Sequence, residues 1–588
     1  MVGTCAGLYF RLTHVSTQQT AAGGQFLTQS IGPGDIFTRE DLTEEQRLFG
    51  RTAAEFMRNE VVPREARIYA HDWALTRELL RKAADLDLLR LEIPEAFGGL
   101  GLDKVSAAFV GEQIALNPSF AGSLGAHTSI GSLPIVYFGT EAQKAKYLPR
   151  LAAGEMIAAY ALTEPESGSD ALAAKTTAVL SRDGRHYILN GQKMWITNGG
   201  FADLFTIFAK VNGEKFTAFL VERSMGVVSG SDEKKLGLEG SSTTALMLDN
   251  VQVPVENVLG TIGEGHKVAF NILNLGRVKL GTRNMAGAKQ ALANATKYAK
   301  ERRQFGRPIA AFGMIKQKLA EMSIRCFVGD SMVFRALGEV DRALEAVDPT
   351  NSVAVLKTIE GFAVECSVNK VYTSEALAYA VDEGLQVFGG NGYSREFPAE
   401  RAYRDARITR IYEGTNEINR MLIPTRLLKA GAASLQDDET RPPATGGPLA
   451  AERVVLARIK SLAIAMLTET AAAFRDEVRD QQEILGHIAD VVIEAYAIES
   501  AAARAEKLRA SRGADAADPA LDSVRVYVTD AVDRVVHAAK QVTRSLGAER
   551  SRSIRALITR LTEFDGVDAV AARRRIADAV IASGKHPY

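Results

Sequence analysis

The sequence predicts an α+β multidomain protein in which two helical domains flank a small β domain and a further helical domain follows a linker. Three observations predict it. Apolar residues recur at three- and four-residue spacing from residue 44 to about 152, and again from about 265. Between these stretches, short β-branched and aromatic segments alternate with Gly-containing turns. A Pro-, Gly- and acid-rich segment at residues 437–447 then interrupts the helical pattern.

These pattern changes place the domain boundaries. We expect a flexible tail over residues 1–34, a helical domain over 35–156, a β domain over 157–264, a helical domain over 265–432, a linker over 433–449 and an additional helical domain over 450–588. Thr43, followed by Glu44 and Glu45, is typical of a helix start. The first 34 residues contain one Arg and no acid before Asp35, which is typical of a disordered tail or of a transit peptide.

The β domain is expected to be a barrel or a sandwich of about 100 residues. Strand-like segments occur at 186–189, 205–209 and 216–221. We expect turns at Asn190-Gly191 and at Asn212-Gly213, because Asn-Gly favours the tight turns of hairpins.

Composition excludes several classes of function. Lys+Arg and Asp+Glu both number 71, so the whole chain presents no net field for nucleic acid. No apolar run reaches the length of a membrane span. Cys5, Cys326 and Cys366 are too widely spaced for a metal site, and we expect the last two to be small core residues of a protein in a reducing compartment. No Gly-x-Gly-x-x-Gly follows a strand, which disfavours a nicotinamide-binding domain.

Five segments could carry chemistry, and each has a structural alternative. Residues 160–170 and 191–200 could hold a flat cofactor, or form a domain entry and a core Trp with a turn. Residues 301–308 could grip a pyrophosphate, or be a solvated helix end, and the Gly-rich residues 386–393 could approach a cofactor or simply cap a helix. Glu413, between Tyr412 and Gly414, could be a partly desolvated base, or a helix-terminal acid near Arg407 and Arg410.

Taken in this order, the five segments resemble the acyl-CoA dehydrogenase family over residues 43–430, and most closely its very-long-chain branch. Thr163-Glu164-Pro165, Trp195-Ile196-Thr197-Asn198-Gly199 and Tyr412-Glu413-Gly414-Thr415 are specific to that family. The resemblance implies an N-terminal helical domain, a middle β domain, a C-terminal four-helix bundle and, in this branch, the extra helical domain.

The resemblance implies FAD as cofactor and assigns residues to it. One group would line or flank the flavin: Tyr160, Leu162, Thr163, Ser169, Trp195, Ile196 and Thr197. A second group would hold the adenosine diphosphate of a partner subunit's FAD, so that a homodimer is expected: Arg302, Gln304, Phe305, Phe312, Gln386, Val387, Gly389 and Gly390. Thr415 and Glu417 would complete the adenine side.

The resemblance also implies the reaction. Glu413 would remove the α-proton of an acyl-CoA thioester while hydride leaves the β-carbon, giving a trans-2-enoyl-CoA in fatty acid β-oxidation. Some family members carry the base immediately before the Arg that corresponds to Arg277, but Gly276 stands there in this chain. Expected substrate contacts are Ser169, Asn274, Arg277 and Gly414, with Gly122 and Gly125 beside a pocket deep enough for long acyl chains.

Electron-transferring flavoprotein is the implied electron acceptor. An oxidase that uses oxygen and a non-catalytic assembly or scaffold role on the same fold stay as alternatives. The acidic segment 437–447 is not a basic amphipathic helix, so it gives no support to peripheral membrane attachment. We expect a cytoplasmic location in a bacterium, with contact at the inner membrane left open, or the mitochondrial matrix in a eukaryote.

Overall fold

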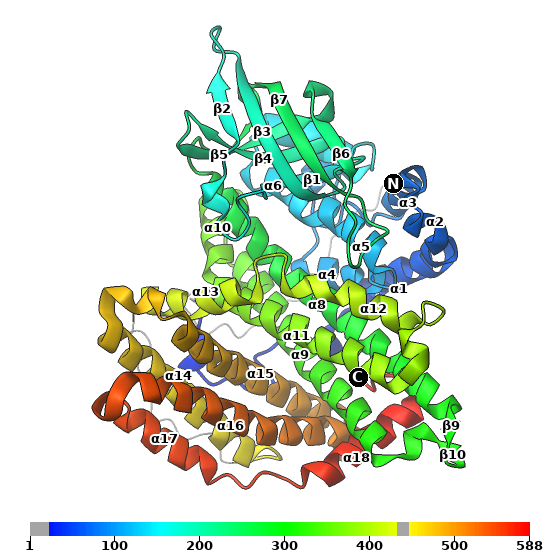
Figure 1. The fold of residues 1–588 in the computed structure, drawn as a ribbon, viewed down its shortest axis with the longest axis vertical. Helices are drawn as coiled ribbons and strands as arrows, with labels where there is room; N and C mark the ends of the chain where they lie inside the picture. The colour runs from blue at the N-terminus through cyan, green and yellow to red at the C-terminus, as the bar shows by residue number, and fades with distance from the viewer. Residues whose placement is uncertain (1–22, 432–445) are drawn as a thin grey trace, which may run out of the picture.

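The computed structural model describes residues 23–431 and 446–588. The N-terminal domain is helical (Figure 1). Thr43 caps its first helix, as expected, by accepting a hydrogen bond from the Gln46 N–H. Its helices are α1 (Glu44–Phe56), α2 (Glu65–Tyr69), α3 (Trp73–Asp85), α4 (Lys104–Ile114), α5 (Pro118–Gly125), α6 (Leu133–Phe138) and α7 (Glu141–Ala152).

The middle domain is one eight-stranded sheet at one end of the molecule (Figure 1). The strands are β1 (Ala158–Ala161), β2 (Thr177–Leu180), β3 (His186–Thr197), β4 (Leu204–Val211), β5 (Lys215–Glu222), β6 (Val228–Asp232), β7 (Thr243–Pro254) and β8 (Val258–Leu259). Their order is β6-β7-β3-β2-β4-β5-β8, with β1 paired in parallel to β4. The predicted fold class, with helices on either side of a β unit in sequence, is confirmed.

One of the two predicted turns is wrong. Asn212-Gly213 does connect β4 to β5, with φ of 53° and 79°. Asn190-Gly191, in contrast, lies inside β3, where the pairing with β7 shifts register between Leu189 and Gly191. Gly191 is required there because a β-carbon would stand 2.5 Å from Oγ1 of Thr176 on the neighbouring chain segment. A bulge and a hairpin turn select the same dipeptide, and local sequence does not separate them.

The second helical domain is built around two long helices, α8 and α11, most of whose residues are buried (Figure 1). Helix α8 packs against α11 and α9 and also contacts α4 and β5, so it touches all three domains named so far. The helices are α8 (Gly265–Glu301), α9 (Gly313–Glu345), α10 (Ser352–Gly361), α11 (Ala363–Phe388), α12 (Pro398–Ala406) and α13 (Asn416–Lys429), with the short hairpin β9 (Arg303–Gln304) and β10 (Arg307–Pro308) after α8. Cys326 and Cys366 are buried in this domain, as expected.

The additional domain is helical and packs on α9 and α13. Its helices are α14 (Ala450–Phe474), α15 (Gln482–Arg512), α16 (Ala514–Arg550), α17 (Arg552–Thr562) and α18 (Ala569–Ser583). A network of buried ion pairs connects this domain to the rest of the chain. Asp330 on α9 accepts from Arg39 at 2.7 Å and from Arg504 on α15 at 3.3 Å, and Arg504 also pairs with Glu40 at 2.8 Å.

The expected flexible tail is wrong for residues 23–34. Phe26 and Leu27 are buried in the core that α14 and α15 share with α9. The Gly24 N–H donates to Glu365 at 2.7 Å, and Lys460 donates to the Gln29 carbonyl at 2.8 Å. Polar composition suggested a tail, but two adjacent apolar side chains are enough to anchor it. Residues 1–22, which include the transit-peptide-like stretch, and most of the expected linker (432–445) lie outside the described residues.

Within the described residues, no helix combines the length and the apolar character that crossing a membrane requires.

Candidate active site

Glu413 lies in the short connection between the helical turn η12 (Arg407–Arg410) and α13. Its φ is +57° and that of Gly414 is +83°. The left-handed conformation is uncommon for a residue with a side chain and is held here by its surroundings. Thr415 caps α13 by accepting from the Ile418 N–H, and Asn419 donates to the Gly414 carbonyl at 2.9 Å.

Helix α8 supplies the surface against which Glu413 rests. A β-carbon built at Gly276 would lie 2.9 Å from Oε2 of Glu413 and 3.1 Å from its Oε1, so any other residue would force this carboxylate to shift. The next residue, Arg277, donates from Nε to the Glu413 carbonyl oxygen at 2.9 Å. Asn274, one turn earlier, accepts from Arg277 at 2.9 Å and so orients that guanidinium. Consecutive residues of one helix thus both shape and hold the position of Glu413.

The electrostatics of Glu413 suit a base. Its Oε2 atom is buried, and no hydrogen-bond donor reaches that atom from within residues 23–431 and 446–588. Burial raises the pKa of Glu413 above its ordinary value, and the positive charges of Arg277, Arg283 and Lys370 oppose that rise. These cations, rather than Arg407 and Arg410, define its surroundings. An unpaired buried carboxylate of raised pKa is prepared to accept a proton.

The two segments that are expected beside the flavin, residues 160–170 and 191–200, are joined by a buried ion pair. Lys193 donates to Glu164 at 2.6 Å and to the Phe208 carbonyl at 2.5 Å, and its side chain is fully buried. Glu164 also accepts from the backbone N–H of Lys175 and Thr176. The Met194 N–H donates to the Thr163 carbonyl at 2.9 Å. The pair therefore fixes residues 163–164 against the end of β3, a connection that sequence reasoning missed.

The end of β3 presents an aromatic surface. The β3–β7 register shifts between Lys193 and Ile196, and Trp195 at this bulge has a φ of +60° and is 50% exposed. Leu162, Thr163 and Thr197 are half-buried, Ser169 is exposed, and Tyr160 is buried. Ile196 is in the core of the sheet, so only its backbone can face a ligand.

The second predicted cofactor group lies at the other end of the molecule from the sheet, around the hairpin β9–β10 (Figure 1). Phe305 at its tip is 92% exposed and contacts Phe312 edge to face. Arg302, Gln304, Gln386, Gly389 and Gly390 are exposed, whereas the side chain of Val387 is buried in the helical core. One chain therefore does not bring the two groups together. Glu417 is exposed in the first turn of α13.

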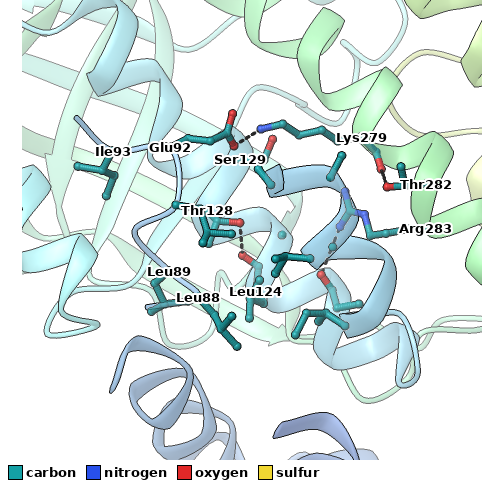
Figure 2. Close-up of a pocket in the computed structure, with 18 residues that line it drawn as sticks. Leu88, Leu89, Glu92, Ile93, Leu124, Thr128, Ser129, Lys279, Thr282 and Arg283 are labelled. Carbon is teal, nitrogen blue, oxygen red and sulfur yellow. Dashed lines mark hydrogen bonds and ion pairs between the residues drawn. The ribbon is translucent and has the colours of Figure 1, made fainter. Parts of the chain in front are cut away.

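A small pocket lies between α8, α4 and α5, and Lys279, Thr282 and Arg283 line it from α8 (Figure 2). Figure 2 shows Glu92 and Lys279 meeting on one side, with Leu88 and Leu89 opposite. Gly125 lines this pocket; Gly122 does not, although a β-carbon there would meet open space. Arg283 of α8 also lines it. Sequence reasoning missed Arg283, and its seven-residue spacing from Gly276 is the signal that could have found it.

Comparison with known proteins decides the family. Models of the N-terminal, middle and C-terminal domains of acyl-CoA dehydrogenases match residues 43–155, 159–251 and 263–428, and a model of a further acyl-CoA dehydrogenase C-terminal domain matches residues 458–559. A probable acyl-CoA dehydrogenase of Bacillus subtilis is 42% identical over 96% of this chain and 98% of its own length. This chain belongs to the acyl-CoA dehydrogenase family.

Two further relatives of this acyl-CoA dehydrogenase family member are informative. The crystal structure of an acyl-CoA dehydrogenase complexed with FAD from Bacillus anthracis has a TM-score of 0.93 and 40% identity, and the match covers 96% of this chain and 99% of that one. The mitochondrial very long-chain specific acyl-CoA dehydrogenase of Rattus norvegicus is 42% identical over 59% of this chain and 52% of its own length. The matches to the Bacillus subtilis and Bacillus anthracis proteins extend over the extra helical domain.

Proposed function

We propose that this protein is an FAD-dependent acyl-CoA dehydrogenase that converts acyl-CoA thioesters to trans-2-enoyl-CoA in fatty acid β-oxidation, with Glu413 as the base. The observation that carries the proposal is the buried, unpaired Oε2 of Glu413, held against Gly276 by a strained turn. Glu365 and Glu499 also leave one buried oxygen without a donor, but each accepts a hydrogen bond through its other oxygen. Among the described residues, no ion pair or side-chain hydrogen bond holds the carboxylate of Glu413, which is unusual for a structural acid.

The residues present fit the cofactor. Trp195 leaves half its surface open at a strand end beside Thr163 and Thr197, which suits an isoalloxazine that needs a flat partner and hydrogen bonds at its edge. The exposed Arg302, Phe305 and Gly389 suit the adenosine diphosphate of a partner subunit's FAD. Since the two groups are far apart in one chain, a homodimer with shared sites follows from the proposal.

The chain's own residues prepare the thioester for reaction. Glu413 accepts the α-proton, and by family resemblance its backbone N–H donates to the thioester carbonyl, where negative charge develops. Arg277 and Asn419 hold this turn through the carbonyl oxygens of Glu413 and Gly414. When bound, FAD supplies the acceptor for the hydride that leaves the β-carbon. The proton and the hydride together account for both hydrogens lost. The finer assignments, a long-chain substrate, electron-transferring flavoprotein as acceptor and a cytoplasmic location, rest on family resemblance.

Anaerobic titration tests the proposal. The purified protein, reconstituted with FAD, should be yellow and should bleach on addition of acyl-CoA from a series of butyryl-CoA to stearoyl-CoA. A protein that takes up no FAD, or a flavin that no acyl-CoA reduces, would overturn it. Reoxidation separates the alternatives. Rapid turnover with electron-transferring flavoprotein supports a dehydrogenase, whereas peroxide formed at the full turnover rate in air identifies an oxidase.

A further inference from the structure

Arg283 is placed on the path from the catalytic end of the site to the apolar pocket. It follows Gly276 by seven residues on α8, which is two turns, so both residues lie on the same face of the helix about 10 Å apart. Gly276 contacts Glu413 and Arg283 lines the pocket. Lys279 lies between them on the helix and also lines the pocket, but its ammonium group pairs with Glu92. Arg283 is the second cation of this wall.

The guanidinium of Arg283 lies against the α5 backbone at the wall of the pocket. A β-carbon built at Gly125 would overlap Nη1 of Arg283, so the absence of a side chain at Gly125 creates the space the guanidinium occupies. Nη1 donates to the Ala121 carbonyl at 3.3 Å, which is a long bond. Across the described ranges no carboxylate lies within ion-pair distance of Arg283. A charge held by one long hydrogen bond is easily moved.

The space behind Arg283 is apolar but small. Leu88, Leu89, Val110, Ile114 and Leu124 form most of its wall. Its volume is about 50 Å³, which leaves room for only a few water molecules. An acyl tail that extends beyond Arg283 must therefore displace that side chain to enter.

We propose that Arg283 is a gate for acyl chain length: short acyl groups leave its guanidinium on α5, whereas long ones displace it and enter the apolar pocket. This inference rests on the proposed function. Arg283 is also a cation near Glu413, so its displacement changes the environment of the base. The gate thus links the length of the acyl chain to the pH range in which Glu413 works.

The direction of that link follows from the groups around Glu413. The cations facing it are Arg277 and Arg283 from α8 and Lys370 from α11, and the neighbouring phenols are Tyr160 and Tyr412. Arg283 favours the carboxylate and so lowers the pKa of Glu413. When a long chain moves Arg283 away, that pKa rises. The acidic limb of the rate profile should therefore lie at higher pH for a long substrate than for a short one.

Binding of unreactive substrates tests the gate without turnover. Thioether analogues of hexanoyl-CoA and palmitoyl-CoA, with sulfur in place of the β-carbon, cannot lose a β-hydride. With the FAD-loaded enzyme, Arg283→Met should tighten binding of the palmitoyl analogue roughly tenfold, because no charge must be moved from its place, and leave the hexanoyl analogue within about twofold. Arg58→Met, an exposed Arg on the N-terminal domain, is the matched control. Equal changes for both analogues would overturn the gate.

Rates of anaerobic flavin reduction from pH 5 to 9 give a second, independent readout. In the wild type the acidic limb should lie about 0.5 pH unit higher with palmitoyl-CoA than with hexanoyl-CoA. In Arg283→Met the two limbs should coincide at the higher value, and Arg283→Lys should restore part of the difference. Coincident limbs in the wild type contradict the gate. If both substrates bleach the wild type and the pH profile does not depend on Arg283, the gate is wrong but the proposed function stands. If no acyl-CoA bleaches the flavin, the proposed function is wrong as well.

Discussion

Gly276 and Glu413 are mutually dependent: a β-carbon at Gly276 would stand 2.9 Å from Oε2 of Glu413. The two residues are far apart in sequence, yet the absence of a side chain at one defines the position of the other. By resemblance, members of the family carry the base at one of two positions, which correspond here to Gly276 and Glu413. In this chain the two positions face each other. A side chain at Gly276 and the present position of Glu413 exclude each other sterically.

Gly276→Ala should therefore slow flavin reduction by acyl-CoA by about 100-fold, because displacement of a catalytic group by about 1 Å has effects of that size. Its thermal unfolding should change little, since the displaced carboxylate is at the site and not in the apolar core. Stopped-flow reduction and a melting curve check both expectations. Gly287→Ala, on the same helix with a β-carbon 3.0 Å from Leu377, is a control for substitution of a helical glycine. An unchanged reduction rate in Gly276→Ala would contradict the steric account.

Much of this arrangement could be predicted from the sequence, and the reasons are local. The change in hydrophobic period marked where helices give way to the sheet, and Thr43 marked a helix start. Glu413, Arg277 and Gly276 were predicted together by resemblance, and the structure brings them into contact.

What could not be predicted depends on long-range contacts. Asn190-Gly191 forms a bulge because β7 pairs with β3 on both sides of it. The dipeptide itself does not determine this pairing. Lys193 looked like a polar strand residue, but Glu164 of a different segment allows its complete burial. The position of the Arg283 guanidinium depends on α5, which places Gly125 against it.

Arg277 should affect the pH dependence of catalysis. It is one of the cations that lower the pKa of Glu413, so Arg277→Gln should raise that pKa by about 1 unit. Because the base must be ionised, the acidic limb of the flavin reduction rate should move to higher pH by the same amount. Rates measured with hexanoyl-CoA from pH 5 to 9 test this. A limb that stays in place, or moves to lower pH, would be incompatible with the charges described around Glu413.

The buried pair Lys193–Glu164 should stabilise the cofactor-facing end of the sheet. Lys193→Met leaves Glu164 as a buried carboxylate without its cation and should lower the free energy of unfolding by about 3 kcal/mol. The double variant Lys193→Met/Glu164→Gln removes both charges and should recover part of the loss. Urea unfolding of the wild type, of Lys193→Met, of Glu164→Gln and of the double variant measures the coupling. If the double variant is less stable than the sum of the single changes, the pair does not act as described.

His127 should make the protein less stable in acid. Its Nδ1 accepts from the Ala158 N–H at 3.0 Å and its Nε2–H donates to the Leu151 carbonyl at 3.1 Å, so the ring is neutral. Burial lowers the pKa of His127 from 6.5 to about 4. Below pH 6.5 the unfolded chain binds a proton that the folded protein rejects. Stability is therefore fully present above pH 6.5 and falls by about 3 kcal/mol as the pH drops to about 4.

His127→Gln removes this titration. Between pH 7 and pH 4 the free energy of unfolding of the wild type should fall by about 3 kcal/mol more than that of the variant. If the substitution lowers the free energy of unfolding equally at every pH, this comparison of slopes is not affected. Parallel slopes for the two proteins would show that folding does not lower the pKa of His127.

The most direct test of the central claim is the rate of anaerobic flavin reduction in Glu413→Gln. Gln keeps the size of the side chain and removes the proton-accepting carboxylate, so reduction by acyl-CoA should slow by about 1,000-fold while FAD and substrate analogues still bind. Glu413→Asp, which shortens the side chain but keeps the acid, should retain more activity than Gln. A Glu413→Gln enzyme that binds FAD and bleaches at the wild-type rate would show that Glu413 is not the base.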